Sequence, residues 1–310
     1  MYTELRPAQQ LSVPVRTMRY NVRVWGDPQA RQPGLPPLVL VHGWMDVGAS
    51  YQFVVDAFGQ AFTEGRLIIA PDWRGFGHSM PEVPTDHYVF ADYLADLDHL
   101  IDHFSPDAPV DLVGHSMGGN VSMMYAGARA GRIRRLVNLE GFGLAATQPS
   151  DAPRRYARWM DELRQHERGD LQMRPYDSLE GVAARLMKTN PRITPDKARW
   201  LAGHWASQDA DGQWNILGAS AHKIVTPMLF RVEEMLALYA AITAPVLSVE
   251  AEENHIAKWS NGKYSLQEYH ERLRQVPDVR SAQVMDAGHM LHHDQPQAVA
   301  RLIEDFLLAN

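Results

Sequence analysis

Short apolar runs alternate with amphipathic stretches along most of the chain. Continuous apolar runs of strand length occur at residues 38–41, 67–70, 110–113, 136–139 and 246–249, as expected for parallel strands covered on both faces. Between the runs, apolar residues recur at helical spacing, as in Phe90, Leu94, Leu97, Ile101 and Phe104. This alternation predicts an α/β fold with a doubly wound, mostly parallel sheet.

The two ends of the chain add further elements to this fold. Residues 12–25 partly alternate apolar and polar side chains, which favours an antiparallel hairpin at the sheet edge. A final helix is predicted to begin at Pro296, after Asp294. Its apolar face consists of Val299, Leu302, Ile303, Phe306 and Leu307.

The alternation stops between residues 146 and 235, where every periodic stretch indicates helix. We therefore expect core residues 1–145 and 236–310, with a helical cap at 146–235 inserted between two late strands, over the carboxyl edge of the sheet. Its stripes are Tyr156, Trp159, Met160 and Leu163, then Trp200, Leu201 and Trp205 after Thr194 and Pro195, then Met228, Val232, Met235 and Tyr239. These residues either pack the cap on the core or, as we assign Trp159 and Trp205, line a substrate pocket.

Composition narrows the possible partners. The chain has 310 residues, 45% hydrophobic and 22% charged, with a net charge of −7 and no cysteine. The negative charge argues against nucleic acid and anionic membranes, and no apolar run approaches the ~18 residues of a membrane span. Residues 1–6 carry no signal-peptide core. We expect a cytoplasmic protein with a small-molecule, ester-like substrate, and a homo-oligomer is compatible with the sequence.

A glycine-flanked serine follows the run at 110–113. The sequence Gly114-His-Ser116-Met-Gly118 is typical of a strand that turns sharply into a helix and presents a nucleophilic serine. Bulkier residues at the two glycines would collide with neighbouring elements. The Met117 N–H, in the first helical turn, is then a candidate oxyanion donor.

A second loop, at His42-Gly43-Trp44, follows the run at 38–41. The Trp44 N–H is the predicted second oxyanion donor. His42 is expected mainly to hold the loop, and His42, Gly43 and His115 are assigned as residues lining the substrate site.

The general base is expected near the end of the chain. His289 follows Gly288 after the apolar residues of 282–285, and a serine that precedes its histidine in the chain fits this architecture. His292 and His293 complete a His-x-x-His-His cluster that would also suit a metal. Because no Glu-x-x-His helix or cysteine accompanies the cluster, we expect no metal and no cofactor.

Together these motifs resemble the α/β-hydrolase family, from about residue 35 onward. Within that family the chain is most similar to capped serine hydrolases, including the serine hydrolase-like branch. Its layout also resembles haloalkane dehalogenases and epoxide hydrolases, but those carry aspartate where Ser116 stands. The matching motifs are His42-Gly43-Trp44, Asp72-x-Arg74-Gly75-x-Gly77-x-Ser79, Gly114-His-Ser116-Met-Gly118-Gly119 and Gly288-His289. We expect Asp72 and Arg74 to pair and hold their loop.

The resemblance implies a catalytic acid after residues 246–249, where the family usually has aspartate and this chain has Asn254. Asparagine cannot stabilise an imidazolium by charge. Glu140, directly after residues 136–139, is the favoured acid, because a carboxylate at a buried strand end needs a partner such as His289. A salt bridge to an arginine would also explain Glu140. Glu252 and Glu253 are the alternative acids, unless they are solvated charges.

The resulting expectation is a carboxylic-ester hydrolase with a triad of Ser116, His289 and Glu140 and an acyl-enzyme, acting on a small to medium, partly apolar substrate. Cleavage of lactones, amides or carbon–carbon bonds by the same triad is an alternative, since specificity is set by the cap. A further alternative is a low-turnover ligand sensor with the same fold.

Overall fold

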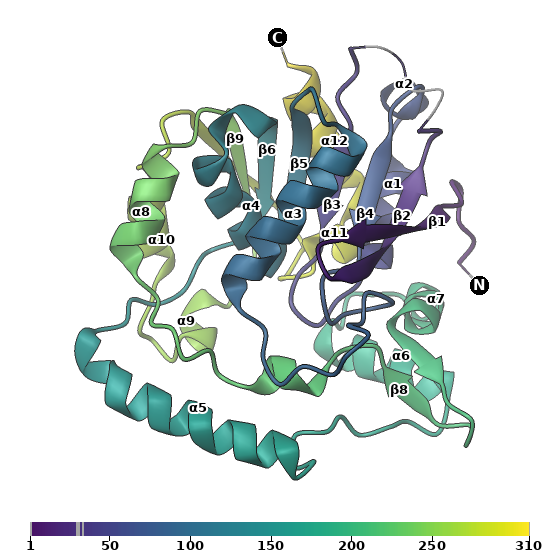
Figure 1. The fold of residues 1–310 in the computed structure, drawn as a ribbon. Helices are drawn as coiled ribbons and strands as arrows, with labels where there is room; N and C mark the ends of the chain where they lie inside the picture. The colour runs from purple at the N-terminus through teal and green to yellow at the C-terminus, as the bar shows by residue number, and fades with distance from the viewer. Residues whose placement is uncertain (1, 29–31, 33, 310) are drawn as a thin grey trace.

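An eight-stranded sheet forms the centre of the protein, which is described by a computed structural model covering residues 2–28, 32 and 34–309 (Figure 1). The strand order is β1-β2-β4-β3-β5-β6-β9-β10. All neighbours pair in parallel except β1 with β2 and β2 with β4. The strands are β1 (Gln9–Val15), β2 (Met18–Trp25), β3 (Leu38–Val41), β4 (Ile68–Pro71), β5 (Val110–His115), β6 (Ile133–Leu139), β9 (Val246–Ala251) and β10 (Val279–Val284). The mostly parallel sheet and its edge hairpin are as predicted; Met1 and Asn310, at the ends of the predicted core ranges, lie outside the described residues.

Two apolar layers cover the sheet because side chains alternate along each buried strand. In β3, Val39 and Val41 join one layer, whereas Leu38 and Leu40 join the other. The first layer is completed by α3 (Phe90–Phe104), α4 (Met117–Ala128), α8 (Val232–Ala240) and α10 (Leu266–Leu273), and the second by α1 (Gln52–Ala57), α2 (Gln60–Thr63), α11 (Leu291–Asp294) and α12 (Pro296–Leu308). The predicted apolar faces of α3 and α12 are the faces that pack against the sheet.

The cap is the segment of the chain that connects β6 to β9, and it lies at one end of the sheet (Figure 1). It contains η3 (Pro149–Asp151), α5 (Ala152–Glu167), α6 (Leu179–Thr189), α7 (Pro195–Trp205), β7 (Ala206–Gln208), β8 (Trp214–Ile216) and η4 (Ser220–Lys223). The expectation of a purely helical cap is wrong, because β7 and β8 form an antiparallel pair. Asp209 accepts hydrogen bonds from the N–H groups of Asp211 and Gln213, and Gly212 has φ 82°. This turn closes the hairpin.

The long helix α5 stands away from the sheet (Figure 1), and none of its residues is buried. Met160 is 47% exposed, as is Tyr156 on the same stripe, so the expectation that Met160 packs the cap on the core is wrong. Met228 is 62% exposed and precedes α8 rather than lying on it. Within the described ranges, no helix combines the length and the apolar character needed to cross a bilayer.

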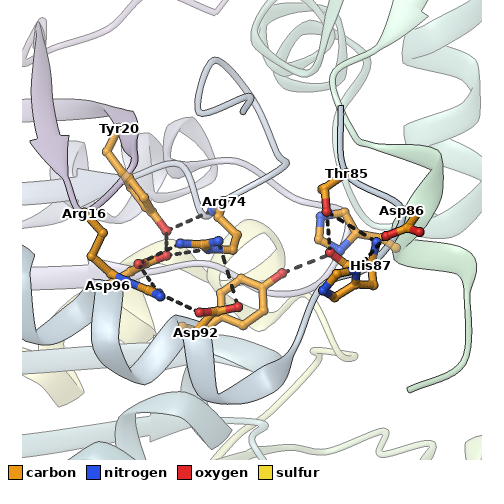
Figure 2. A network of polar contacts seen from close by, with 10 residues as sticks. Arg16, Tyr20, Arg74, Thr85, Asp86, His87, Asp92 and Asp96 are labelled. Carbon is orange, nitrogen blue, oxygen red and sulfur yellow. Dashed lines mark hydrogen bonds and ion pairs between the residues drawn. The ribbon is translucent and has the colours of Figure 1, made fainter. Parts of the chain in front are cut away.

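A buried network of charges anchors the loop after β4 (Figure 2). Asp96 of α3 is inaccessible to solvent and accepts from Arg74 Nε at 2.6 Å and from the Tyr20 hydroxyl at 2.5 Å. Arg16 reaches Asp92 at 2.6 Å and Asp96 at 3.1 Å. The network joins the edge hairpin, α3 and this loop.

Asp72, in the same loop, is therefore not the partner of Arg74, and the predicted pairing is wrong. Its Oδ1 accepts from the Gly48 N–H at 2.8 Å, and its Oδ2 accepts from Asn21 Nδ2 at 2.8 Å and the His78 N–H at 3.0 Å. Asp72 serves as a scaffold, because these bonds tie β2 to the segment that follows the His42-Gly43-Trp44 loop. The remaining elements are η1 (Gly48–Tyr51), η2 (Ala130–Arg132) and α9 (Ile256–Trp259).

Candidate active site

Ser116 lies in a strained turn between β5 and α4. Its backbone has φ 51° and ψ −114°, a conformation that costs a residue with a side chain about 1–3 kcal/mol. The surroundings enforce it: the Ser116 N–H donates to the Leu139 carbonyl at 2.8 Å. A Cβ on Gly118 would lie 2.3 Å from the carbonyl oxygen of Val41, so glycine is required there. The turn therefore presents the hydroxyl at the carboxyl edge of the sheet.

His289 and Glu140 lie in line with this serine. His289 Nε2 is 3.0 Å from Ser116 Oγ, and His289 Nδ1 is 3.2 Å from Glu140 Oε2. The three side chains come from separate segments, 149 residues apart for Glu140 and His289 and 173 for Ser116 and His289. The structure thus brings together the three residues that the sequence singled out.

Strand order explains why Glu140 reaches this position. Glu140 directly follows β6 and has φ 57°. Because β6 pairs with β9, the Ala251 N–H at the end of β9 donates to Glu140 Oε1 at 2.7 Å. The alternative acids lie elsewhere: Glu252 accepts from the Asp286 N–H at 2.8 Å, and Glu253 pairs with Arg192 at 2.6 Å. Neither contact involves His289.

Burial dominates the electrostatics of this pair. Desolvation raises the pKa of Glu140, and the hydrogen bond from the Ala251 N–H opposes that shift. Desolvation also lowers the pKa of His289 to about 4, and the nearby His255 acts in the same direction. A neutral imidazole over the neutral pH range is the form that accepts a proton from a hydroxyl.

The loop after β3 lies against the nucleophile. A Cβ on Gly43 would be 3.2 Å from Ser116 Cβ, so the missing side chain permits the approach. Met45 has φ 55°, and Trp205 of the cap donates from Nε1 to the Met45 carbonyl at 3.0 Å. Met117 begins α4, so its N–H has no partner within the helix. Both predicted oxyanion donors, Trp44 and Met117, therefore belong to segments next to Ser116.

The two histidines assigned to the substrate site are buried. Trp73 N–H donates to His42 Nε2 at 2.7 Å, and His42 Nδ1 donates to the Gly43 carbonyl at 2.7 Å, which leaves no ring nitrogen for a substrate. His115 donates from Nε2 to the His289 carbonyl at 2.8 Å. Both therefore position loops of the site.

The two tryptophans assigned to the substrate pocket lie in different surroundings. Trp205 holds the Met45 backbone. Trp159 lines a hollow of about 40 Å³ with Tyr88 and Val225 among its neighbours, and Ser116 is not part of its lining. The sequence missed Trp259, whose ring lies 4.3 Å from that of His289, edge to face, and is 51% exposed. Trp259 ends the short helix α9, and no motif in the sequence marked it.

The fold and this geometry agree with the family comparison. A family model described as the alpha/beta hydrolase fold matches residues 36–296. The chain belongs to the α/β-hydrolase family. Membership supports hydrolase activity, and the strained Ser116 turn between β5 and α4 is the place where such a fold presents its nucleophile.

Relatives of this α/β-hydrolase span nearly its whole length. It is 23% identical to a serine hydrolase-like protein of Danio rerio, over 98% of this chain and 90% of that protein. It is 26% identical to the 2-(acetamidomethylene)succinate hydrolase of Mesorhizobium japonicum, over 89% and 90%. Among solved structures, the thioesterase domain from the curacin biosynthetic pathway superposes with a TM-score of 0.78 at 19% identity, covering 96% of this chain and 99% of that domain.

Proposed function

We propose that this protein is a serine hydrolase that cleaves carboxylic esters through Ser116, His289 and Glu140. The observation that supports it best is the continuous line of contacts from Ser116 Oγ through His289 to Glu140, at 3.0 Å and 3.2 Å. A base within hydrogen-bond reach of the nucleophile, oriented by a third group, is the requirement for an activated serine.

In the proposed reaction, His289 Nε2 accepts the proton of Ser116 as Oγ attacks the ester carbonyl carbon. The tetrahedral intermediate collapses to an acyl-enzyme when His289 returns that proton to the departing alkoxide. Water then attacks the acyl carbonyl, giving its proton to His289, and the acid leaves as Ser116 regains its hydrogen. Glu140 accepts from His289 Nδ1 throughout and stabilises the transient imidazolium.

The oxyanion that forms in both steps would be held by the N–H groups of Trp44 and Met117. The positive φ of Met45 and the Trp205 contact with its carbonyl support the Trp44 N–H as the first donor, and the position of Met117 at a helix N-terminus supports the second. Loss of one such donor typically costs ~10²–10³ in rate. A side-chain substitution cannot delete a backbone N–H, but it can displace one. The close approach of Gly43 to Ser116 keeps the Trp44 segment beside the nucleophile.

The test is steady-state hydrolysis of p-nitrophenyl esters of increasing acyl length. Ser116→Ala should lower kcat by about 10⁶-fold, in practice to background. Ser122→Ala is the matched control, because Ser122 is a buried serine of α4, the helix that follows Ser116, and donates to the Gly118 carbonyl at 2.7 Å. Turnover by Ser116→Ala equal to that of the control would refute the nucleophile.

A second reaction on the same residues is amide hydrolysis, supported by the relative from Mesorhizobium japonicum, whose name specifies an acetamido compound. Parallel assays with an ester and the matching anilide separate the two, since the better substrate has the higher kcat/KM. A stoichiometric acyl adduct on Ser116 without turnover of either compound would contradict both proposals and favour a sensor.

A further inference from the structure

Three buried side chains cluster close to the triad without taking part in it. Asp46 follows the loop that carries Trp44, and His292 and His293 lie on α11, just after His289. Asp46 is 6% exposed, His292 0% and His293 4%. One oxygen or nitrogen atom from each lies within 4.8 Å of the others. These three residues therefore offer potential metal ligands at a place where the sequence predicted no metal.

The hydrogen-bonding capacity of this cluster is largely unused. Asp46 Oδ1 accepts from the Ser50 hydroxyl, whereas, within the described part of the chain, Oδ2 has no hydrogen-bond partner. The same holds for both ring nitrogens of His292 and for His293 Nε2. His292 Nε2 lies 3.9 Å from Asp46 Oδ2, too far for a hydrogen bond. Such groups are costly to bury unless something pairs with them.

A transition-metal ion can pair with all three groups of the cluster, whereas a proton can pair with only two of them. An imidazole nitrogen without a proton offers a lone pair to a metal ion, and the Asp46 carboxylate offers an oxygen beside the two rings. A proton would bridge only one gap, whereas a divalent ion accepts two imidazoles and a carboxylate together.

We propose that Asp46, His292 and His293 bind one divalent transition-metal ion, with Zn²⁺ as the best match. Zn²⁺ bonds of about 2.1 Å place ligand atoms roughly 3.4 Å apart in a tetrahedral site, so the most widely separated ligand atoms need to approach by up to about 1.4 Å from their limit of 4.8 Å. The ion would join the loop of the oxyanion donor to the loop of the base. It takes no part in the ester reaction, so the site is independent of the proposed function.

The experiment measures metal content and stability of the full chain. Protein from zinc-supplemented cells is assayed for bound metal, then stripped with chelator and titrated with Zn²⁺ against a chromophoric competitor, with long equilibration because the site is closed. We expect one Zn²⁺ per chain and a rise of about 5 °C in Tm at free Zn²⁺ about one hundred times Kd. Co²⁺ in place of Zn²⁺ should give visible absorption typical of nitrogen and oxygen ligands.

Variants distinguish this site from surface binding. Asp46→Asn keeps the acceptor for Ser50 and removes the charge, and His293→Gln keeps a polar side chain of similar volume. Each should weaken Zn²⁺ binding at least ~100-fold. The matched control is His87→Gln, which removes an exposed histidine 2.6 Å from Asp86, labelled in Figure 2, and should bind as wild type.

Two results would overturn the proposal. One is wild-type protein that takes up less than stoichiometric Zn²⁺ and shows no Co²⁺ spectrum, which means that water alone fills the gaps. The other is Zn²⁺ affinity that is unchanged in His293→Gln, or lost in His87→Gln, which assigns binding to the surface. The wild-type measurement decides the question even where Asp46→Asn does not fold.

Discussion

Replacement of Glu140 by glutamine is the sharpest test of how the triad is built. Glu140 is 2% exposed, and the amide oxygen of the Glu140→Gln variant can retain the hydrogen bond from the Ala251 N–H, which is 2.7 Å from Oε1 in the wild type. The change therefore removes a charge without removing a partner or creating a cavity. The thermal midpoint should stay within a few degrees of wild type.

Activity should respond very differently from stability. The amide no longer stabilises the imidazolium and, by offering an N–H to His289 Nδ1, favours the wrong tautomer. The expected loss in kcat is about 10⁴-fold, equivalent to about 5 kcal/mol of transition-state stabilisation. This is far larger than the effect of an ordinary buried hydrogen bond, about 1 kcal/mol.

The assay is steady-state kinetics with a short p-nitrophenyl ester, alongside thermal unfolding followed by circular dichroism. Glu252→Gln is the control, because Glu252 accepts from the exposed Asp286 N–H, and this variant should remain close to wild type. If Glu140→Gln keeps more than about a tenth of wild-type kcat/KM while Glu252→Gln is inactive, the reasoning from Glu140 is wrong.

Three further outcomes are expected. The acid limb of kcat/KM against pH should lie lower in Glu140→Gln than in wild type, because burial lowers the pKa of His289 and only the wild-type carboxylate, 3.2 Å from Nδ1, favours the protonated imidazole and opposes that shift; identical limbs would contradict the coupling. Trp205→Phe removes the 3.0 Å hydrogen bond to the Met45 carbonyl and should lower kcat about tenfold with little change in Tm, and an unchanged kcat would show that the loop holds itself. Gly118→Ala puts a Cβ 2.3 Å from a carbonyl oxygen of β3 and should lower the unfolding free energy by about 3 kcal/mol. Urea unfolding measures this change, and a midpoint equal to that of wild type would refute the steric argument.

Local pattern was sufficient for most of the sheet and for the nucleophile. Apolar runs predict strands because a parallel strand covered on both faces needs apolar residues throughout. The glycines around Ser116 indicate the sharp turn because the neighbouring backbone leaves no room for a Cβ, as the 2.3 Å approach to the Val41 carbonyl oxygen shows. These signals lie within a few residues of the feature they predict, so they can be read along the chain.

Contacts between distant segments were decided by the tertiary structure alone. Sequence left Glu140, Glu252 and Glu253 as candidate acids, and the pairing of β6 with β9 places Glu140 beside the Ala251 N–H and His289. Asp46 and the two histidines of α11 meet for the same reason, although some 250 residues separate them. Periodicity reports which face of an element is apolar; which other element covers that face, or leaves it exposed as for Tyr156, depends on packing across the whole fold.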